Sequence, residues 1–406
     1  MPNGTGYPAS RSLSFCTRWR LSAKRRLVPH GAGGNAFRPR FRRFSGSAPY
    51  EGEPVSNDRV HGPPVAPSAD LLRDIVSEFA LGRVSAPPIL AGGGGSADRV
   101  WKLITDQGAW AVKESVGSVI EPPDIERISS GVLFEREAWE HGIPMPEPRL
   151  TVNGAPLLEA PVGPPESVVT VREWIDGEPV GWNESAAERE PAALLLAASL
   201  ARLHSTQWRT ARPLSEWWKY SPGFDRWSEL EARARYQNAP WIDGLAEAIP
   251  RLEEAEAIIA TYLAASTLSM CHLDANPHNV LRTRGGIKLI DWDGAGLASP
   301  DQEIASVLAN WACDGTGMPM DGLPNRMLAA YRDAGGTCGS WDLGVFIQHL
   351  TGWLNWIELQ MTIALGLRPD DPRTRSQADQ SVRDLFVWTR RLDGLQLLLD
   401  KLEAGD

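Results

Sequence analysis

The sequence predicts an α+β fold in which a small strand-rich part precedes a larger, mainly helical part. Alternating apolar and polar residues mark much of residues 89–174, whereas helical periodicity dominates from about residue 185 onward. The change falls in "EWIDGEPVGW", residues 173–182, where Gly177 and Pro179 interrupt the periodicity. We therefore expect a basic leader over residues 1–68, a first lobe over 69–176 and a second lobe over 177–406.

Charge is distributed unevenly along the 406 residues. The first fifty residues contain ten basic residues and no acidic ones, which leaves 31 basic and 51 acidic residues, a net charge of −20, for the remainder. An acidic body disfavours nucleic acid as a partner and suits a cationic small molecule. The leader is rich in Arg, Ser, Gly and Pro and should be poorly ordered. It has the composition of a transit peptide or of a tail that contacts nucleic acid or lipid, but a dispensable tail or a misassigned start is the favoured reading.

Cysteine usage and hydropathy indicate a cytoplasmic protein without a membrane span. The four cysteines show no CxxC spacing, which disfavours structural zinc and a disulfide framework. The most apolar stretch is "FIQHLTGWLNWIELQMTIALGL", residues 346–367, in which polar residues recur and apolar ones follow helical spacing. It therefore predicts a buried helix that does not contact a membrane.

The first lobe begins with a helix and continues with strands. Ser68 or Asp70 can cap a helix in "SADLLRDIVSEFAL", residues 68–81. In "ILAGGGGSADRVWKLITDQGAWAVKES", residues 89–115, two strand-like runs flank a turn at residues 106–108, and the second run carries Lys113. Residues 124–141 then favour a helix, Asn153-Gly154 favours a hairpin, and "SVVTVREW", residues 167–174, favours a strand.

Three polar residues in the second lobe have the spacing that phosphoryl transfer needs. "CHLDANPHNV", residues 271–280, contains Asp274 and, five positions later, Asn279; after a turn at Gly285-Gly286, the run "IKLI" leads to Asp291. The Asp-x4-Asn interval is that of a kinase catalytic loop, in which the Asp orients the acceptor hydroxyl and the Asn binds magnesium. A purely structural use of these residues in caps and turns is the alternative.

The segment "CHLDANPHNVLRTRGGIKLIDWDGAG" resembles the signature of the aminoglycoside phosphotransferase and choline kinase-like family. The chain as a whole is similar to this family over about residues 70–400. The resemblance implies a protein-kinase-like fold and the use of ATP and Mg²⁺. It places the catalytic base on Asp274, the start of the catalytic loop on His272, and the magnesium ligands on Asn279 and Asp291. His272 is thereby a catalytic-loop candidate, although a buried histidine there would typically brace the loop.

The order of elements in the first lobe independently predicts a nucleotide site. A lid over the nucleotide is predicted at Gly92, Gly93, Gly94, Gly95 and Ser96, followed by Lys113 as the phosphate-binding lysine. No P-loop motif is present. The link between the lobes, with Glu173, Trp174 and Ile175, should meet the adenine through its backbone.

Two supporting carboxylates are less certain from the sequence. Gly131 stands where a lysine-pairing glutamate is expected; Glu137 is preferred, with Glu135 and Glu126 open. The family also places an aspartate shortly after "IDW" to support the catalytic loop, and either Asp301 or Glu303 can fill that role. Asp293 is expected to be a supporting or capping carboxylate.

The acceptor is expected to be a hydroxylated small molecule that could be cationic. Acidic residues of the second lobe could line such a site or simply be solvated: Asp314, Asp321, Glu358, Asp370 and Asp371. An aminoglycoside-type antibiotic, and so a role in antibiotic resistance, is favoured; choline, homoserine, a macrolide or a sugar are alternatives. A pseudokinase and a non-enzymatic binder of cations are kept as other classes, whereas a protein kinase is disfavoured because D-F-G and A-P-E motifs are absent.

Overall fold

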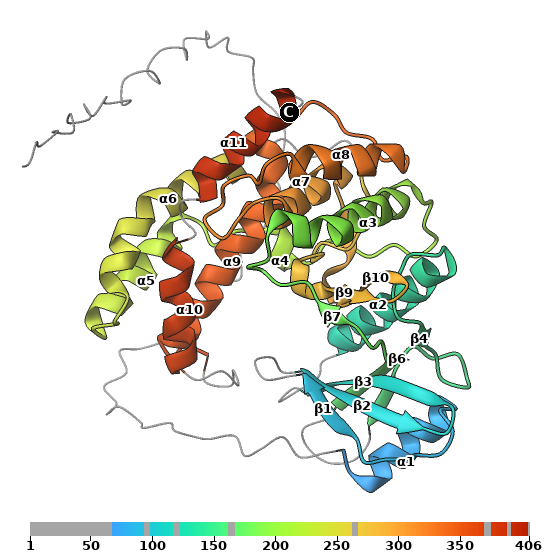
Figure 1. Ribbon diagram of the computed structural model, residues 1–406. Coiled ribbons are helices and arrows are strands. Elements are labelled where there is room, and N and C mark those ends of the chain that lie inside the picture. Colours follow the sequence, from blue (N-terminus) through green and yellow to red (C-terminus); the bar gives the residue numbers. More distant parts are fainter. Residues whose placement is uncertain are drawn as a thin grey trace, which may run out of the picture. The chain divides into compact units, whose positions relative to one another are not determined.

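The computed structural model describes residues 67–92, 98–116, 122–160, 167–261, 267–368, 375–387 and 391–404. Most of the predicted leader, the glycine-loop residues Gly93 to Ser96, and the acidic pair Asp370 and Asp371 lie outside the described residues. The predicted α+β class is confirmed, because strands dominate up to residue 173 and helices dominate afterwards (Figure 1).

An antiparallel sheet forms the first lobe, with the order β1-β2-β3-β6-β4 and with β5 also pairing β6. Its strands are β1 (Ile89–Gly92), β2 (Asp98–Thr105), β3 (Gly108–Val116), β4 (Pro148–Arg149), β5 (Leu158–Ala160) and β6 (Ser167–Glu173). The predicted hairpin at residues 106–108 is confirmed, since Thr105 pairs with Gly108 across the turn. Lys113 on the central strand β3 pairs with Val100 on one side and Thr170 on the other.

Two helices accompany this sheet. Helix α1 (Ala69–Glu78) is capped by the Ser68 side chain, which accepts from the Leu71 N–H at 3.1 Å. Its buried Ile75 and Phe79 pack against the sheet residues Trp101, Leu103, Val112, Val169 and Val171. Helix α2 (Pro122–Glu140) connects β3 to β4.

The Asn153-Gly154 signal produces a turn but no separate hairpin. Gly154 has φ +80° and its N–H donates to the Thr151 carbonyl at 2.8 Å. The strands on either side, β4 and β5, do not pair with each other but with different residues of the longer strand β6: β4 with residues 171–172 and β5 with residues 167–169. Strand β1 was also not expected, since its four residues carry little periodicity of their own.

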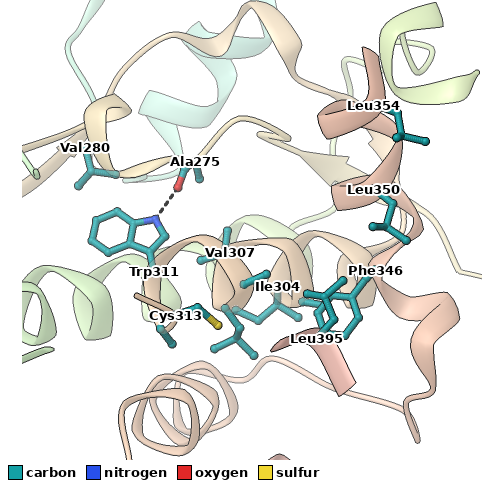
Figure 2. Packing of buried hydrophobic residues seen from close by; sticks show 14 of the residues in the cluster. Ala275, Val280, Ile304, Val307, Trp311, Cys313, Phe346, Leu350, Leu354 and Leu395 are labelled. Carbon is teal, nitrogen blue, oxygen red and sulfur yellow. Dashed lines mark hydrogen bonds between the residues drawn. The ribbon is translucent and has the colours of Figure 1, made fainter. Parts of the chain in front are cut away.

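The second lobe consists of helices packed around one apolar core. The helices are α3 (Ala186–Ser205), α4 (Glu216–Lys219), α5 (Phe224–Tyr236), α6 (Ile242–Ala260), α7 (Pro300–Trp311), α8 (Leu323–Asp333), α9 (Ile347–Ala364), α10 (Arg375–Val387) and α11 (Arg391–Ala404). Figure 2 shows part of this core around Ile304 and Val307 of α7. Their neighbours come from Phe346, which directly precedes α9, from Leu350 of α9 and from Leu395 of α11. The predicted buried helix is α9, and in the part of the chain that the structure describes no helix has the length and apolarity of a membrane span.

Five short strands in this lobe position two loops. Strand β8 (Ser269–Cys271) pairs with β11 (Gly296–Ala298), while β9 (Val280–Thr283) pairs with β10 (Gly286–Leu289) and β7 (Glu178–Pro179). Residues 272–279 therefore connect β8 to β9, and residues 290–295 connect β10 to β11. Because Val280 pairs with Leu289, both loops emerge on the same side, which brings their polar residues together.

Candidate active site

A cavity of about 570 Å³ lies between the sheet of the first lobe and the two loops of the second. Its apolar lining includes Val100, Ala111, Met145, Leu281 and Ile290. Its polar lining includes Lys113, Glu135, Arg172, Asp274, Asn279, Asp291 and Asp293. An apolar cavity with a few convergent charges is what a nucleotide site requires, with room for a flat base at one end and phosphates at the other.

Asp274 is held by amide groups from its own loop. Asn279 donates its side-chain N–H to the Asp274 carboxylate at 2.8 Å and to the Asp274 carbonyl at 2.9 Å. Asn276 donates to the other carboxylate oxygen. The carboxylate is therefore oriented on both of its oxygens, and the loop holds it at the edge of the cavity.

Burial and a second carboxylate disfavour the charged form of Asp274. Burial raises the pKa of Asp274 to about 7, with a further contribution from the charge of Asp291, while the bonds from Asn279 and Asn276 lower it. A carboxylate with a pKa near neutral is suited to accept a proton.

Asp291 approaches Asn279 from the neighbouring loop. The Ile290 N–H donates to the Asn279 carbonyl at 2.9 Å, which couples the backbones of the two loops. Asp291 has the left-handed conformation with φ +62°, a strained geometry that is concentrated at functional sites. Because the Asn279 amide nitrogen is used by Asp274, its oxygen is the atom left to ligate a cation alongside the Asp291 carboxylate. These hard oxygen donors fit Mg²⁺, and a cation there would also relieve the repulsion between Asp274 and Asp291.

Lys113 meets the carboxylates of this second loop. Its Nζ bonds to Asp293 and lies 3.8 Å from Asp291. Burial raises the pKa of Asp293, but the positive charges of Lys113 and Arg172 outweigh it and leave that pKa below its usual value. Asp293 is thus a partner of the cavity lysine, consistent with the supporting role predicted for it.

His272 braces the loop through hydrogen bonds at both of its ring nitrogens. The ring is fully buried; one nitrogen accepts from the Asp274 N–H at 3.3 Å and the other donates to the Ile290 carbonyl at 3.2 Å. Burial lowers the pKa of His272, which favours the neutral ring that these two bonds require. His272 therefore connects the two loops.

Glu303 is the carboxylate that supports the catalytic loop. It lies in α7, is 1% exposed, and accepts from the Leu273 N–H at 2.5 Å and from His204 Nε2 at 2.6 Å. The other ring nitrogen of His204 bonds to the Tyr331 hydroxyl at 2.8 Å. Leu273 needs this support because its φ of +69° is unfavourable for a residue with a side chain. Asp301 instead contacts the Gly339 N–H at 3.3 Å.

The structure does not bring Glu137 to the cavity. Its carboxylate accepts from the backbone N–H groups of Arg209 and Thr210, both at 2.8 Å, and so anchors the segment that follows α3. Glu135 of the same helix lines the cavity, and Arg172 binds it at 2.6 and 2.7 Å. Glu135 takes the place at the cavity that was expected for Glu137, because residues two apart on a helix point to different sides. Its partner there is Arg172, whereas Lys113 bonds to Asp293, so a pairing of a glutamate with Lys113 stays a prediction.

The space beside Gly131 explains the missing carboxylate there. A Cβ on Gly131 would lie 3.3 Å from the guanidinium of Arg212. Arg212 donates to the carbonyls of Trp292 and Asp293, each at 3.3 Å, and so supports the second loop from this position. Glu126 is exposed on α2.

The link between the lobes borders the cavity through Glu173, Trp174 and Ile175. The Glu173 and Trp174 N–H groups are used within the sheet, bonding to the carbonyls of Glu147 and Ala109 at 2.9 Å. Gly92 ends β1 above the cavity, next to the lining residue Ala91. The predicted nucleotide-contacting residues within the described part of the chain thus lie at or beside one cavity, apart from Glu137.

The acidic residues proposed for a cationic substrate have other partners where the structure describes them. Glu358 is bound by Arg226 at 2.6 and 2.9 Å. Asp314 closes its own turn by accepting from Thr316 and Met318, and Asp321 pairs with Lys401 at 3.2 Å. These contacts hold Glu358, Asp314 and Asp321 locally, and a shared role in binding a cationic acceptor stays a prediction.

Sequence reasoning also missed several residues that shape the site. Arg172, His204 and Asn310 belong to no motif, and Asn276 stands at a position of "DANPHN" to which no role was assigned; each acts through a partner far away in the chain or two positions along the loop. The basic residue near the end of "SVVTVREW" was the only signal, since charge in a buried central strand is rare.

Comparisons with known proteins agree with this geometry. A family model for the phosphotransferase enzyme family matches residues 89–339. A solved spectinomycin phosphotransferase, in complex with ADP and spectinomycin, has a TM-score of 0.58 at 13% identity and covers 80% of this chain and 98% of its own. An amicoumacin kinase in complex with AMP-PNP and Ca²⁺ has a TM-score of 0.53 at 15% identity, with 80% and 93% covered.

A third solved structure, a microcompartment-associated aminopropanol kinase, has a TM-score of 0.52 at 14% identity and covers 80% of this chain and 98% of its own. At these identities the likenesses concern the fold, and they confirm the predicted kinase-like arrangement of a small sheet and a larger helical part. A comparison with curated protein sequences found no match.

Proposed function

The chain belongs to the phosphotransferase enzyme family, acting on hydroxyl groups, and from that premise we propose that it transfers the γ-phosphoryl group of ATP to a small molecule. The observation that carries the proposal is the joint placement of Asp274, Asn279, Asp291 and Lys113 at one cavity. Phosphoryl transfer depends on positioning and on charge stabilisation, and these residues supply both.

Each residue has a role that its contacts support. Asp274 accepts the proton of the acceptor hydroxyl while that oxygen bonds to the γ-phosphorus and the bond to the ADP oxygen breaks. Lys113 binds the α- and β-phosphates, and the hinge backbone around Glu173 and Ile175 binds the adenine. Asn279 and Asp291 hold Mg²⁺, which neutralises phosphate charge when bound.

The acceptor is proposed to be an amine-bearing alcohol, with aminoglycoside-type antibiotics as the first candidates. The structural neighbours act on spectinomycin, amicoumacin and aminopropanol according to their names. Glu358, Asp314 and Asp321, which were expected to bind a polycation, are bound to other partners, so selectivity for the amine is not assigned to them.

A panel of acceptors tests this function. The protein is incubated with ATP and Mg²⁺ and with spectinomycin, kanamycin, a macrolide, choline, 1-amino-2-propanol, homoserine or glucose, and phosphorylated product is detected by mass spectrometry. Asp274→Asn is the inactive variant, and Asp225→Asn, an exposed aspartate on α5, is its matched control. A product made by the wild type and by Asp225→Asn but not by Asp274→Asn supports the proposal. Nucleotide binding without any transfer contradicts it and favours a pseudokinase.

A further inference from the structure

Asn310 and Asn276, to which the motif assigns no role, form a chain of amide hydrogen bonds that ends on Asp274. Asn310, on the last turn of α7, donates its side-chain N–H to Asn276 Oδ1 at 2.8 Å. Asn276 in turn donates its own side-chain N–H to Asp274 Oδ1. The residues lie 34 positions apart in the chain, so the contact depends on how α7 packs against the loop.

The two bonds share the amide of Asn276, so the direction of each constrains the other. An asparagine amide has a donating end and an accepting end, and only the donating end can bond to a carboxylate. The accepting carboxylate of Asp274 requires the nitrogen of Asn276, which turns the Asn276 oxygen toward α7, where Asn310 supplies the donor that this oxygen needs. If the contact from α7 were an acceptor, the Asn276 nitrogen could not serve α7 and Asp274 in the present arrangement, so the bond to Asp274 would be weakened or lost.

The backbone of the loop is held by other residues of α7. Glu303 binds the N–H of Leu273, and Trp311 Nε1 donates to the Ala275 carbonyl at 2.7 Å, the bond drawn in Figure 2. These contacts lie on either side of Asp274 and do not involve Asn310. Asn310 therefore orients the side chain of Asn276, whereas Glu303 and Trp311 hold the main chain of the loop.

We infer that Asn310 and Asn276 are positioning residues that orient the Asp274 carboxylate toward the acceptor. This inference rests on the proposed function, since Asp274 is there the group that meets the hydroxyl. Asn279 holds one carboxylate oxygen and Asn276 holds the other, so loss of the Asn276 bond leaves the carboxylate plane free to rotate.

The test compares Asn310→Asp with Asn310→Ala and with Asn325→Asp, which makes the same chemical change on α8, where Asn325 donates to the Lys401 carbonyl. Steady-state transfer is measured with the acceptor that the panel identifies. We expect Asn310→Asp to lower kcat about 10- to 100-fold, because small misplacement of a reacting group has effects of that order. Asn310→Ala removes the donor without putting an acceptor in its place and should lower kcat about 3- to 10-fold. In both Asn310 variants KM for ATP should change less than about 2-fold.

A double-mutant cycle separates orientation from the added negative charge. In an Asn276→Ala background the amide that could turn is absent, so Asn310→Asp should have little further effect on kcat. An equal loss in that background, or equal activity of Asn310→Asp and Asn325→Asp, overturns the inference.

A structural measurement keeps the inference testable if the wild type phosphorylates none of the acceptors, which is the failure of the proposed function. Crystal structures of the wild type and of Asn310→Asp, each with Mg²⁺ and AMP-PNP and at a resolution of about 1.2 Å or better, where the amide orientation can be assigned, show whether Asn276 still donates to Asp274. Loss of the Asn276–Asp274 bond in the variant supports the inference, and an unchanged bond overturns it.

Discussion

Replacing Glu303 should both destabilise the protein and disable its catalytic loop. The carboxylate is 1% exposed and accepts bonds from the Leu273 N–H at 2.5 Å and from His204 at 2.6 Å. In Glu303→Ala both donors stay buried without this partner, and Leu273 keeps a backbone conformation that itself costs about 1–3 kcal/mol. Removing one member of a buried charged network costs about 3–5 kcal/mol, which is the expected loss in the free energy of unfolding.

Urea unfolding followed by circular dichroism measures this loss, with Gln302→Ala on the same helix as the control. Glu303→Gln keeps one accepting oxygen and should lose less, about 1–3 kcal/mol. We expect phosphate transfer at a temperature where both proteins are folded to fall further in Glu303→Ala than in Gln302→Ala, because Leu273 directly precedes Asp274. Equal stability of Glu303→Ala and the control would refute the reasoning.

Two further predictions concern stability. Hydrogen bonds to Glu137 outweigh the effect of its burial and lower its pKa from the ordinary value of 4.5 to about 2. Because the pKa is lower in the folded protein, the contribution of Glu137 to the free energy of unfolding is complete above pH 4.5 and is lost as pH falls toward 2. Unfolding free energies of wild type and Glu137→Gln should therefore converge over that range, and a constant difference would contradict the assignment. A Cβ on Gly352 of α9 would lie 2.2 Å from the Trp218 ring; Gly352→Ala should thus lower stability by about 1–3 kcal/mol despite its better helix propensity. In Gly315→Ala the added Cβ meets no atom within 4 Å, and if this control loses as much in a thermal melt, the clash is not the cause.

The parts of the fold that were predictable from sequence are those with strong local signals. The Ser68 cap, the β2–β3 hairpin and the buried helix α9 each follow from a pattern contained within a few turns of chain. Strands β4 and β5 depend on a shared partner, β6, and their pairing cannot be read from the turn between them. Local chemistry thus predicts which element forms, but not always which neighbour it joins.

The candidate site divides in the same way. Asp274, Asn279 and Asp291 were identifiable because their spacing is set by one loop and one hairpin. The choice between Glu135 and Glu137 was not, because it is decided by Arg172 and Arg209, which reach α2 from distant segments. For the acidic residues of the second lobe, composition shows the charge but not the local partner, such as Arg226 for Glu358 or Lys401 for Asp321.

The most direct test of the central claim is phosphate transfer by Asp274→Asn alongside direct measurement of nucleotide binding. Isothermal titration with Mg²⁺ and AMP-PNP compares wild type, Asp274→Asn and Asp225→Asn, and product formation is then measured with the best acceptor. We expect Asp274→Asn to bind the nucleotide within a few-fold of wild type and to lose transfer by about 10²- to 10⁴-fold, the contribution typical of a general base. Transfer by Asp274→Asn at the rate of Asp225→Asn would show that Asp274 is not the group that activates the acceptor.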